Sequence, residues 1–503
     1  MQTFPACSLE WLPVKVSPMH LLHAASELLP YSKTGGLADM VSALTRALAR
    51  SGHSVDVVTP LYRGIRERFP DIRPAGWRFD LRLGDGVVSG EFWRVEPEPR
   101  LTLWFVDQPG FFDRAGLYNE HQVDYPDNAA RFTFLSKAAF LLARHLPERV
   151  DLVQCHDWQT GLLPILVQHA RVTTGWASAP RTLFTIHNLA YQGAFPAAQW
   201  ALANLPDSWL HMESALHHSQ WNFMKGGLAL ADALATVSPN YAREICTAEY
   251  GCGLDGLLRR REYELTGILN GVDYGEWNTT ANPALPHAFD ADHLEGKASN
   301  KIDLQAELGL QPRPDLPLFA NITRLTDQKG ADLQLAALQE LLAAGVPLQF
   351  ALLGSGHPGL ESDYQSLAAQ HPGQVAVTIG FDAALAHRME AAADFFLMPS
   401  RFEPCGLNQL YSLRYGTLPV VRATGGLQDS VIDPRENLER ATGIKFHDPS
   451  APALANAIRK ALSLYPNTDL LRHFRRNGMR SDFSWEKQSR EYVELYEQVI
   501  HGV

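Results

Sequence analysis

The stretch Lys33-Thr34-Gly35-Gly36-Leu37-Ala38-Asp39 follows a short apolar run, Leu21–Ala25, and precedes a run of helical character that ends at Arg50. Two adjacent glycines at a strand-to-helix turn let the backbone approach a ligand closely. The helix N-terminus behind them favours an anion, and Lys33 adds a full positive charge. This stretch therefore predicts an anion-binding turn between a strand and a helix.

A near copy of the turn, Thr424-Gly425-Gly426-Leu427-Gln428-Asp429, lies 390 positions further along the chain. One such turn is a weak signal, because paired glycines also occur in ordinary loops. Two copies so far apart predict two lobes that each offer a glycine turn to a shared cleft.

Short apolar runs alternate with longer helical stretches in two groups. The first group is Leu21–Ala25, Val55–Thr59, Thr102–Val106, Leu152–Cys155, Thr182–Ile186, Ala233–Val237 and Thr266–Leu269. The second group is Leu318–Ile322, Gln349–Leu353, Val375–Ile379, Phe395–Met398, Leu418–Val421 and Ile444–Phe446. Spacings of roughly 20 to 30 residues fit repeating βαβ units with parallel strands buried on both faces. The pattern predicts an α/β chain of two doubly wound, Rossmann-like domains.

A polar, irregular stretch that contains Pro283 and Pro286 separates the two groups, and a helical pattern closes the chain. We expect an extension with no secretory character, two domains, a linker between them and a C-terminal helix. The predicted boundaries are 1–18 for the extension, 19–273 for the N-terminal domain, 274–300 for the linker, 301–482 for the C-terminal domain and 483–503 for the final helix.

Composition excludes several classes of protein. The net charge of −11 over 503 residues argues against a nucleic-acid surface, which needs a basic face. No apolar run approaches the ~20 residues that span a bilayer, so no membrane partner is expected. The five cysteines are scattered and form no CxxC pair, which predicts neither a disulfide framework nor a zinc site and favours a reducing cytoplasm.

Polar and glycine residues follow the apolar runs in both halves. They are His156-Asp157-Trp158, His187-Asn188, Thr323-Arg324 with Lys329-Gly330, Gly354-Ser355-Gly356 and Pro399-Ser400-Arg401-Phe402-Glu403. Ligands of open α/β sheets bind beyond the carboxyl ends of the strands. Two such edges that face each other predict an active site between the domains.

These motifs, in this order, resemble those of bacterial glycogen synthase and plant starch synthase. The resemblance rests on KTGGLADM, CHDW, TIHNLAYQG, FMKGGL, TVSP, ILNGVD, ITRLTDQKG and SRFEPCGLNQLYSLRYGTLPVVRATGGLQD, and covers the chain from about Met19 onward. It implies a GT-B fold, with two Rossmann-like domains around a deep cleft. It also implies transfer of glucose from ADP-glucose to the non-reducing end of an α-1,4-glucan, such as a glycogen primer, with retention of configuration. In relatives the C-terminal helix returns to the N-terminal domain.

A departing diphosphate gains negative charge, so fixed cations aimed at it should contribute most to catalysis. Arg324 and Lys329 match the phosphate-binding pair of glycogen synthases. The N–H groups of Cys405, Gly406 and Leu407, at an expected helix start, would complete the phosphate cradle. The alternative for either cation alone is a solvated surface charge.

The resemblance assigns Glu403 to the glucosyl unit, where it supports positive charge near the anomeric carbon. Its alternative role is a carboxylate at a helix N-terminus. A retaining glycosidase needs a second carboxylate as nucleophile, and related transferases carry one eight positions on, where this chain has Tyr411. Departure and attack on one face of the sugar are therefore the preferred hypothesis. His187 matches the histidine expected to hydrogen-bond the donor glucose, although a lone histidine is more often structural.

Further site residues are implied by the resemblance. Lys33, Gly35 and Gly36 are expected at the donor diphosphate, and Asp39 nearer the sugar. The remaining expected neighbours of the donor, acceptor or sugar are Asn188, Tyr191, His156, Asp157 and Trp158, of which Trp158 has a core alternative. Gln159 stands where many relatives have histidine, so an acceptor role is not carried over to it.

Phe381 occupies the place where relatives often carry a tyrosine that stacks on adenine, with a packed core aromatic as the alternative. No cofactor is expected, and no metal either, because the one Asp-x-Asp, Asp290–Asp292, falls in the predicted linker. Two other functions stay open. They are a related glucosyltransferase that uses UDP-glucose or another acceptor, and a catalytically silent glucan-binding protein. A sugar-nucleotide epimerase does not account for the motif set.

Overall fold

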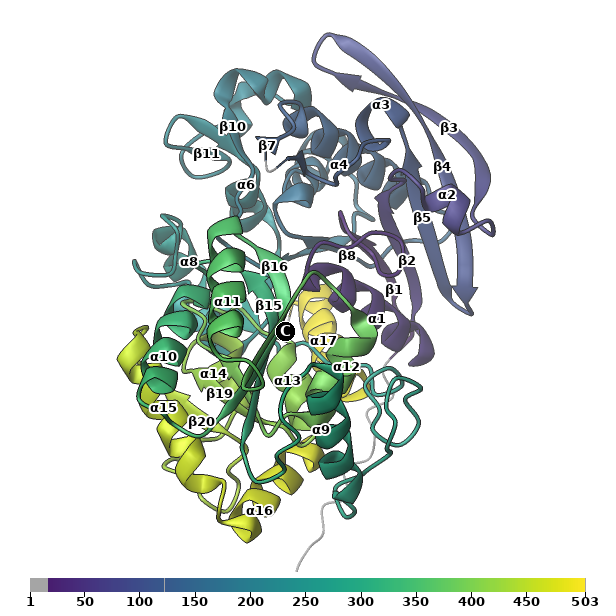
Figure 1. Ribbon diagram of the computed structural model, residues 1–503. Helices are drawn as coiled ribbons and strands as arrows, with labels where there is room; N and C mark the ends of the chain where they lie inside the picture. Colours follow the sequence, from purple (N-terminus) through teal and green to yellow (C-terminus); the bar gives the residue numbers. More distant parts are fainter. Residues whose placement is uncertain (1–16, 122, 503) are drawn as a thin grey trace, which may run out of the picture.

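The computed structural model describes residues 17–121 and 123–502. Two lobes stand one above the other in Figure 1, each built on its own sheet. The N-terminal lobe holds a nine-stranded sheet and the C-terminal lobe a six-stranded parallel sheet. Most of the predicted extension, residues 1–16, lies outside the described residues.

The N-terminal sheet is parallel except for a hairpin at one edge. Its strands, in spatial order, are β14 (Leu265–Gly267), β13 (Ala233–Thr236), β9 (Arg181–Ile186), β8 (Leu152–His156), β1 (His20–Ala24), β2 (Ser54–Pro60), β5 (Leu101–Asp107), β4 (Gly86–Glu98) and β3 (Arg73–Leu83). The helices of this lobe are α1 (Gly36–Arg50), α2 (Ile65–Arg68), α3 (Pro109–Phe112), α4 (Asn128–His145), α5 (Leu163–Thr174), α6 (Phe223–Leu230), α7 (Pro239–Glu244) and α8 (Asp255–Arg260).

Short elements complete the N-terminal lobe. The strands β10 (Ala194–Pro196), β12 (Gln220–Asn222) and β11 (Leu216–His217) form a small antiparallel sheet, and β6 (Asn119–Glu120) pairs with β7 (Val123–Asp124). The 3₁₀ turns are η1 (Trp158–Thr160), η2 (Ala197–Ala203), η3 (Asp207–Trp209) and η4 (Glu262–Glu264).

The C-terminal sheet is parallel throughout. Its strands, in spatial order, are β17 (Val375–Ile379), β16 (Gln349–Gly356), β15 (Leu318–Leu325), β18 (Phe395–Met398), β19 (Leu418–Arg422) and β20 (Ile444–Phe446). Its helices are α9 (Glu295–Glu307), α10 (Ala331–Ala343), α11 (Pro358–Gln370), α12 (Ala383–Ala392), α13 (Asn408–Arg414), α14 (Gly425–Ser430), α15 (Ala451–Leu464) and α16 (Thr468–Arg480).

Every apolar run that the sequence analysis picked out overlaps one of these parallel strands, so the prediction of two α/β lobes is confirmed. The hairpin β3–β4 was not predicted. Its residues alternate between buried and exposed faces instead of forming a continuous apolar run. Phe79 and Phe92 anchor the hairpin against Phe134 of α4, and the extended arm is visible at the upper right of Figure 1.

The chain crosses between the lobes twice, and the two crossings lie side by side. Val272 forms a parallel bridge with Ser484, just before the last helix, α17 (Trp485–His501). That helix packs on α1 and β9 of the N-terminal lobe, and the Tyr496 hydroxyl donates to Gln154 Oε1 (2.5 Å).

The predicted linker, 274–300, is irregular only up to residue 294, because α9 begins at Glu295. The exact domain boundaries stay a prediction. Among the described helices, none combines the length and apolar character that a bilayer crossing requires.

Candidate active site

A buried carboxylate organises the N-terminal glycine turn. Glu27 accepts hydrogen bonds from Thr34 N (2.6 Å), Thr34 Oγ1 (2.6 Å) and Gly35 N (3.3 Å). These N–H groups are therefore not free for a ligand. The next two, of Gly36 and Leu37 at the start of α1, have no hydrogen-bond partner among the described residues. The N–H groups that remain available to an anion are thus those of the first turn of α1.

Lys33 and Asp39 form an ion pair beside this helix start. Lys33 Nζ lies 2.7 Å from Asp39 Oδ1, and the lysine side chain is 44% exposed. Burial raises the pKa of Asp39, although the neighbouring Lys33 ammonium opposes the shift. An anion that reaches this turn would meet an accessible ammonium already oriented by a carboxylate.

In the C-terminal lobe the strand ends bring Lys329 and Glu403 together. Lys329 Nζ donates to Glu403 Oε2 (2.6 Å), and Ser400 Oγ donates to the same oxygen (2.9 Å). Glu403 is buried. It does not sit at a helix N-terminus, since α13 begins only at Asn408, so its alternative role is not supported.

Arg324 is the penultimate residue of β15, and its side chain is exposed. Within 17–121 and 123–502 its guanidinium makes no hydrogen bond or ion pair, unlike those of Arg50, Arg114 and Arg401, which pair with carboxylates. It is available to an anion. A solvated charge is equally compatible with this geometry.

The segment Cys405–Leu407 precedes α13, with Leu407 as its N-cap. The sequence analysis expected these residues at a helix start, and they lie immediately before one. Their backbone N–H groups have no hydrogen-bond partner in the described part of the chain. Gly406 adopts φ +73°, a left-handed conformation that favours glycine and turns the backbone sharply at this point.

The two lobes bring these groups to a common place. A Cβ added at Gly36 would lie 3.6 Å from Leu407 Cδ1. The start of α1 therefore faces the segment that follows β18. Lys33 and the Lys329–Glu403 pair come from opposite lobes onto this shared boundary.

His187 lies just after β9 and is nearly buried. Its Nε2 is 3.0 Å from His156 Nδ1, and burial lowers the pKa of His187 to about 3, so its ring is neutral. The prediction that His156 lines the sugar side is wrong. Its side chain is fully buried, and its second nitrogen lies 3.2 Å from His23 Nδ1.

Asp157 fixes the loop after β9 by accepting hydrogen bonds from its backbone. Its Oδ1 accepts from His187 N (2.7 Å) and Asn188 N (3.3 Å). Burial raises the pKa of Asp157 to about 7, against the effect of these two hydrogen bonds. Its backbone has φ +55° and ψ −177°, a strained conformation for a residue other than glycine, and such strain is typical of functional sites.

The other predicted neighbours divide into packing and exposed groups. Trp158 packs edge-on against Phe132 and Phe223, which supports its core alternative. The Asn188 side chain accepts from Ala190 N (3.1 Å) and so shapes its own turn. Tyr191 is 56% exposed.

Phe381 follows β17 and is 82% exposed. The packed-core alternative for this residue is therefore wrong. An open aromatic face at a strand end is suited to stacking on a planar ring.

The second glycine turn does not offer its N–H groups to a ligand. Glu244, from α7 of the other lobe, accepts from Thr424 Oγ1 (3.1 Å) and Gly425 N (3.0 Å). The backbone of Glu403 and Cys405 packs directly against the two glycines. The C-terminal lobe therefore does not present its glycine turn to a ligand as expected, and the corresponding role of the N-terminal turn stays a prediction.

Sequence reasoning missed Glu27 and the role of Glu244, and it did not foresee that Ser400, placed at a strand end, contacts Glu403. Glu27 could have been found, because it follows β1 by three residues, in the position where polar side chains gather. Glu244 could not, since its partner Gly425 is 181 positions away.

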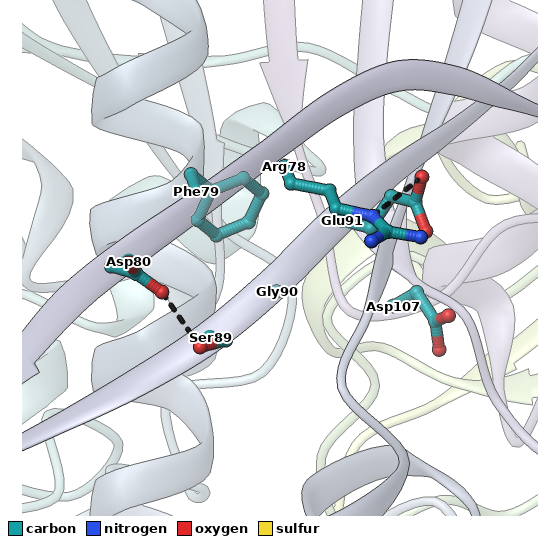
Figure 2. A pocket seen from close by; sticks show the side chains of 7 residues that line it. All are labelled: Arg78, Phe79, Asp80, Ser89, Gly90, Glu91 and Asp107. Carbon is teal, nitrogen blue, oxygen red and sulfur yellow. Dashed lines mark hydrogen bonds and ion pairs between the residues drawn. The ribbon is translucent and has the colours of Figure 1, made fainter.

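A separate hollow lies on the β3–β4 hairpin, away from these strand ends. Figure 2 shows Ser89 Oγ donating to Asp80 Oδ1 (2.6 Å) and Arg78 pairing with Glu91 (3.6 Å) across it. The lining residues are Arg78, Phe79, Asp80, Ser89, Gly90, Glu91 and Asp107. It contains no residue predicted for the site.

In the described part of the chain no three His, Cys, Asp or Glu side chains are grouped so that they could hold a metal ion. That the chemistry needs no metal stays a prediction.

Two family models match the chain. Residues 20–260 match the starch synthase catalytic domain, and residues 309–480 match the glycosyl transferases group 1. A glycogen synthase of Anaeromyxobacter sp. (strain Fw109-5) is 49% identical over 95% of this chain and 99% of its own length. A glycogen synthase of Syntrophotalea carbinolica is 42% identical over 96% and 99%.

Solved structures agree with the sequence relatives. The catalytic domain of starch synthase IV from Arabidopsis thaliana, bound to ADP and acarbose, superposes with a TM-score of 0.87 at 32% identity, covering 96% of this chain and 100% of that one. Sucrose-phosphate synthase from Thermosynechococcus elongatus gives a TM-score of 0.60 at 19% identity, with the same coverage, and shows the fold alone. The GT-B fold expected from the sequence is confirmed.

Proposed function

The chain belongs to the glycogen and starch synthase family of glycosyltransferases, and from this membership we propose that it is a glycogen synthase. It transfers glucose from ADP-glucose to the non-reducing end of an α-1,4-glucan, with retention of configuration. The observation that carries the proposal is the Lys329–Glu403 pair (2.6 Å), held opposite the Lys33 turn of the other lobe.

The distribution of charge suits a nucleotide-sugar donor. When the bond to glucose breaks, negative charge develops on the diphosphate and positive charge on the sugar. Lys33, Arg324 and Lys329 supply cations, and the free N–H groups of Cys405–Leu407 supply dipoles, for the phosphate side. Glu403, a buried carboxylate that pairs with Lys329, supplies the negative charge for the sugar side.

Retention without a glycosyl-enzyme intermediate is consistent with position 411. Position 411 holds a tyrosine, so it offers no carboxylate that could act as nucleophile. The Tyr411 ring stacks on Trp277, with a distance of 3.6 Å between the ring centroids. We therefore place the acceptor hydroxyl and the departing phosphate on the same face of the sugar. The exposed Phe381 is the candidate platform for the adenine ring.

The ligands of one relative support the same assignment. The Arabidopsis starch synthase structure holds ADP and acarbose, a nucleoside diphosphate and an oligosaccharide-like molecule. At 32% identity and complete coverage of that chain, we assign the equivalent pair, ADP and a glucan, to the boundary between the lobes here.

The test is one assay run with two donors. Purified protein is incubated with glycogen and either ADP-glucose or UDP-glucose, and released ADP or UDP, polymer elongation and the anomeric configuration of the new linkage are measured. We expect ADP release with α-linked elongation. Preferential UDP release, or transfer to a small sugar phosphate but not to glycogen, would assign the related glucosyltransferase instead.

The Lys329–Glu403 pair can be tested in the same assay. Lys329→Ala and Glu403→Gln are expected to lower kcat by roughly 10²- to 10³-fold, because each removes a charge aimed at the transition state. Donor binding should change far less. Wild-type turnover in either variant would remove that residue from the mechanism.

A further inference from the structure

Three histidines form a continuous chain from the core of the N-terminal lobe to the candidate site. His23 Nδ1, on β1, lies 3.2 Å from His156 Nε2, at the end of β8. His156 Nδ1 lies 3.0 Å from His187 Nε2. The planes of the His23 and His156 rings are nearly parallel, at 16°, and those of His156 and His187 are tilted by 45°. Neither His23 nor His156 has a role in the transfer described above.

Each of these rings carries a single proton. Burial lowers the pKa of His23 and His187 to about 3. Burial also lowers the pKa of His156 well below its ordinary value, and its two histidine neighbours add to the effect. A neutral imidazole has one N–H donor and one acceptor nitrogen. Two hydrogen bonds between three neutral rings can therefore run in one of two directions only, and reversing one ring reverses all three.

The two ends of the chain differ. His23 Nε2 is buried and has no hydrogen-bond partner among the described residues. His187 Nδ1 has no protein partner either, but His187 retains some exposure at the end of β9, beside Asp157. One direction places an unpaired N–H at the buried end, and the other places only an unpaired acceptor there. Buried unpaired N–H groups are the rarer of the two in proteins.

We propose that His23 and His156 are positioning residues that hold His187 in the Nδ1–H tautomer, so that its ring donates a hydrogen bond to the transferred sugar. The hydrogen bonds then run from His23 Nδ1–H to His156 Nε2, and from His156 Nδ1–H to His187 Nε2. Histidines on or next to three neighbouring strands, β1, β8 and β9, thus fix which nitrogen of His187 carries the proton. The identity of the sugar rests on the proposed function, but the tautomer does not.

The tautomer can be measured directly on the protein without substrate. In ¹⁵N-histidine-labelled protein, the His187 signals are assigned by comparison with His187→Asn. We expect a protonated, pyrrole-type Nδ1 and an unprotonated, pyridine-type Nε2. The reverse pattern in the wild-type protein would overturn the proposal, and this measurement requires no variant at positions 23 or 156.

A matched pair of variants separates positioning from packing. His23→Asn keeps an N–H donor near the Nδ1 position, whereas His23→Leu fills similar space without one. We expect His23→Leu to give mixed tautomers at His187 and about a tenfold loss of kcat/KM for the donor, the size of one lost hydrogen bond. His23→Asn should restore both. Equal losses in the two variants, or an unchanged His187 spectrum in His23→Leu, would show a merely structural role.

Failure of the proposed function is distinguishable from failure of this inference. If the protein uses a donor other than ADP-glucose or transfers another sugar, the His187 spectrum and its response to the two variants are still as stated. If the spectrum is reversed while glycogen is elongated normally, only the histidine proposal falls.

Discussion

The two glycine turns share the letters Thr-Gly-Gly-Leu-x-Asp and share a mode of anchoring, yet they serve different ends. In both, a carboxylate accepts from the threonine hydroxyl and from the N–H of the first glycine. In the N-terminal turn that carboxylate is Glu27, seven residues before Thr34 in the same lobe. In the C-terminal turn it is Glu244, which comes from the opposite lobe.

The two turns also differ in the space around their first glycine. A Cβ at Gly35 would meet nothing within 4 Å, whereas one at Gly425 would collide with the carbonyl oxygen of Glu403. We call the N-terminal turn, Thr34–Asp39, the open turn and the C-terminal turn, Thr424–Asp429, the closed turn. Lys33 precedes the open turn, and Ala423 precedes the closed turn. The motif therefore specifies a tight, carboxylate-anchored turn. Whether that turn meets a ligand or fastens two lobes depends on what lies beside it.

The largest effect should come from adding one methyl group to the closed turn. Gly425→Ala places a Cβ against backbone at φ +44°, and we expect a loss on the order of 3 kcal/mol in folding stability, with activity lost in parallel. The matched variant in the open turn, Gly35→Ala, has extended backbone and free space, and should melt within about 1 °C of wild type. Thermal melts of both variants check this. Equal melting temperatures would erase the distinction between the turns.

The second prediction concerns the residue that precedes the open turn, which is replaced by the residue that precedes the closed turn. Lys33→Ala gives it the alanine found at position 423 and removes the accessible ammonium. We expect kcat/KM for the donor to fall by roughly 10²-fold, because a cation aimed at a developing charge is lost, with an unchanged melting temperature. Steady-state kinetics at varied donor concentration measure it. An unaltered kcat/KM would place the diphosphate elsewhere.

A smaller effect is expected from the anchor of the open turn. Glu27→Gln keeps the shape of the side chain but directs an amide N–H at groups that are already donors. We expect a loss of about 2 kcal/mol, typical of hydrogen bonds to a buried charge, and a raised KM for the donor as the turn loosens. Glu27→Asp, which keeps the charge on a shorter side chain, is the control. Identical stability of Glu27→Gln and wild type would contradict the anchoring role.

The smallest effect concerns pH at the anchor of the closed turn. Burial raises the pKa of Glu244 above its ordinary value of 4.5, despite hydrogen bonds from Gly425 and Thr424. Its contribution is therefore complete below pH 4.5 and declines as the pH rises through the folded-state pKa. The melting temperature of wild type relative to Glu244→Gln should fall by no more than about 2 °C across that window. A difference that increases with pH would reverse the sign of the shift.

Sequence reasoning reached the parallel strands, the lobes and the polar residues at the strand ends, because these depend on local apolar runs and on the residues that follow them. It placed Lys329 and Glu403 at one edge, and the structure pairs them. It failed where contacts are distant in the chain. His156 lies in a strand-end motif, but β1 and β9 on either side cover it with histidines. The β3–β4 hairpin was not predicted, because its alternating pattern of buried and exposed residues differs from the continuous apolar runs of the parallel strands.

The return of α17 has a consequence for biosynthesis. Tyr492 and Tyr496 belong to the hydrophobic core of the N-terminal lobe, although they follow the whole C-terminal lobe in the sequence. Domains generally fold as they emerge from the ribosome, the first one first. Here the lobe that emerges first waits, with an uncovered patch beside α1 and β9, until the other lobe has been synthesised. Helix α17, made after the second lobe, then closes a core that began to form before that lobe existed, so a chain terminated ahead of α17 leaves the patch open to chaperones and proteases.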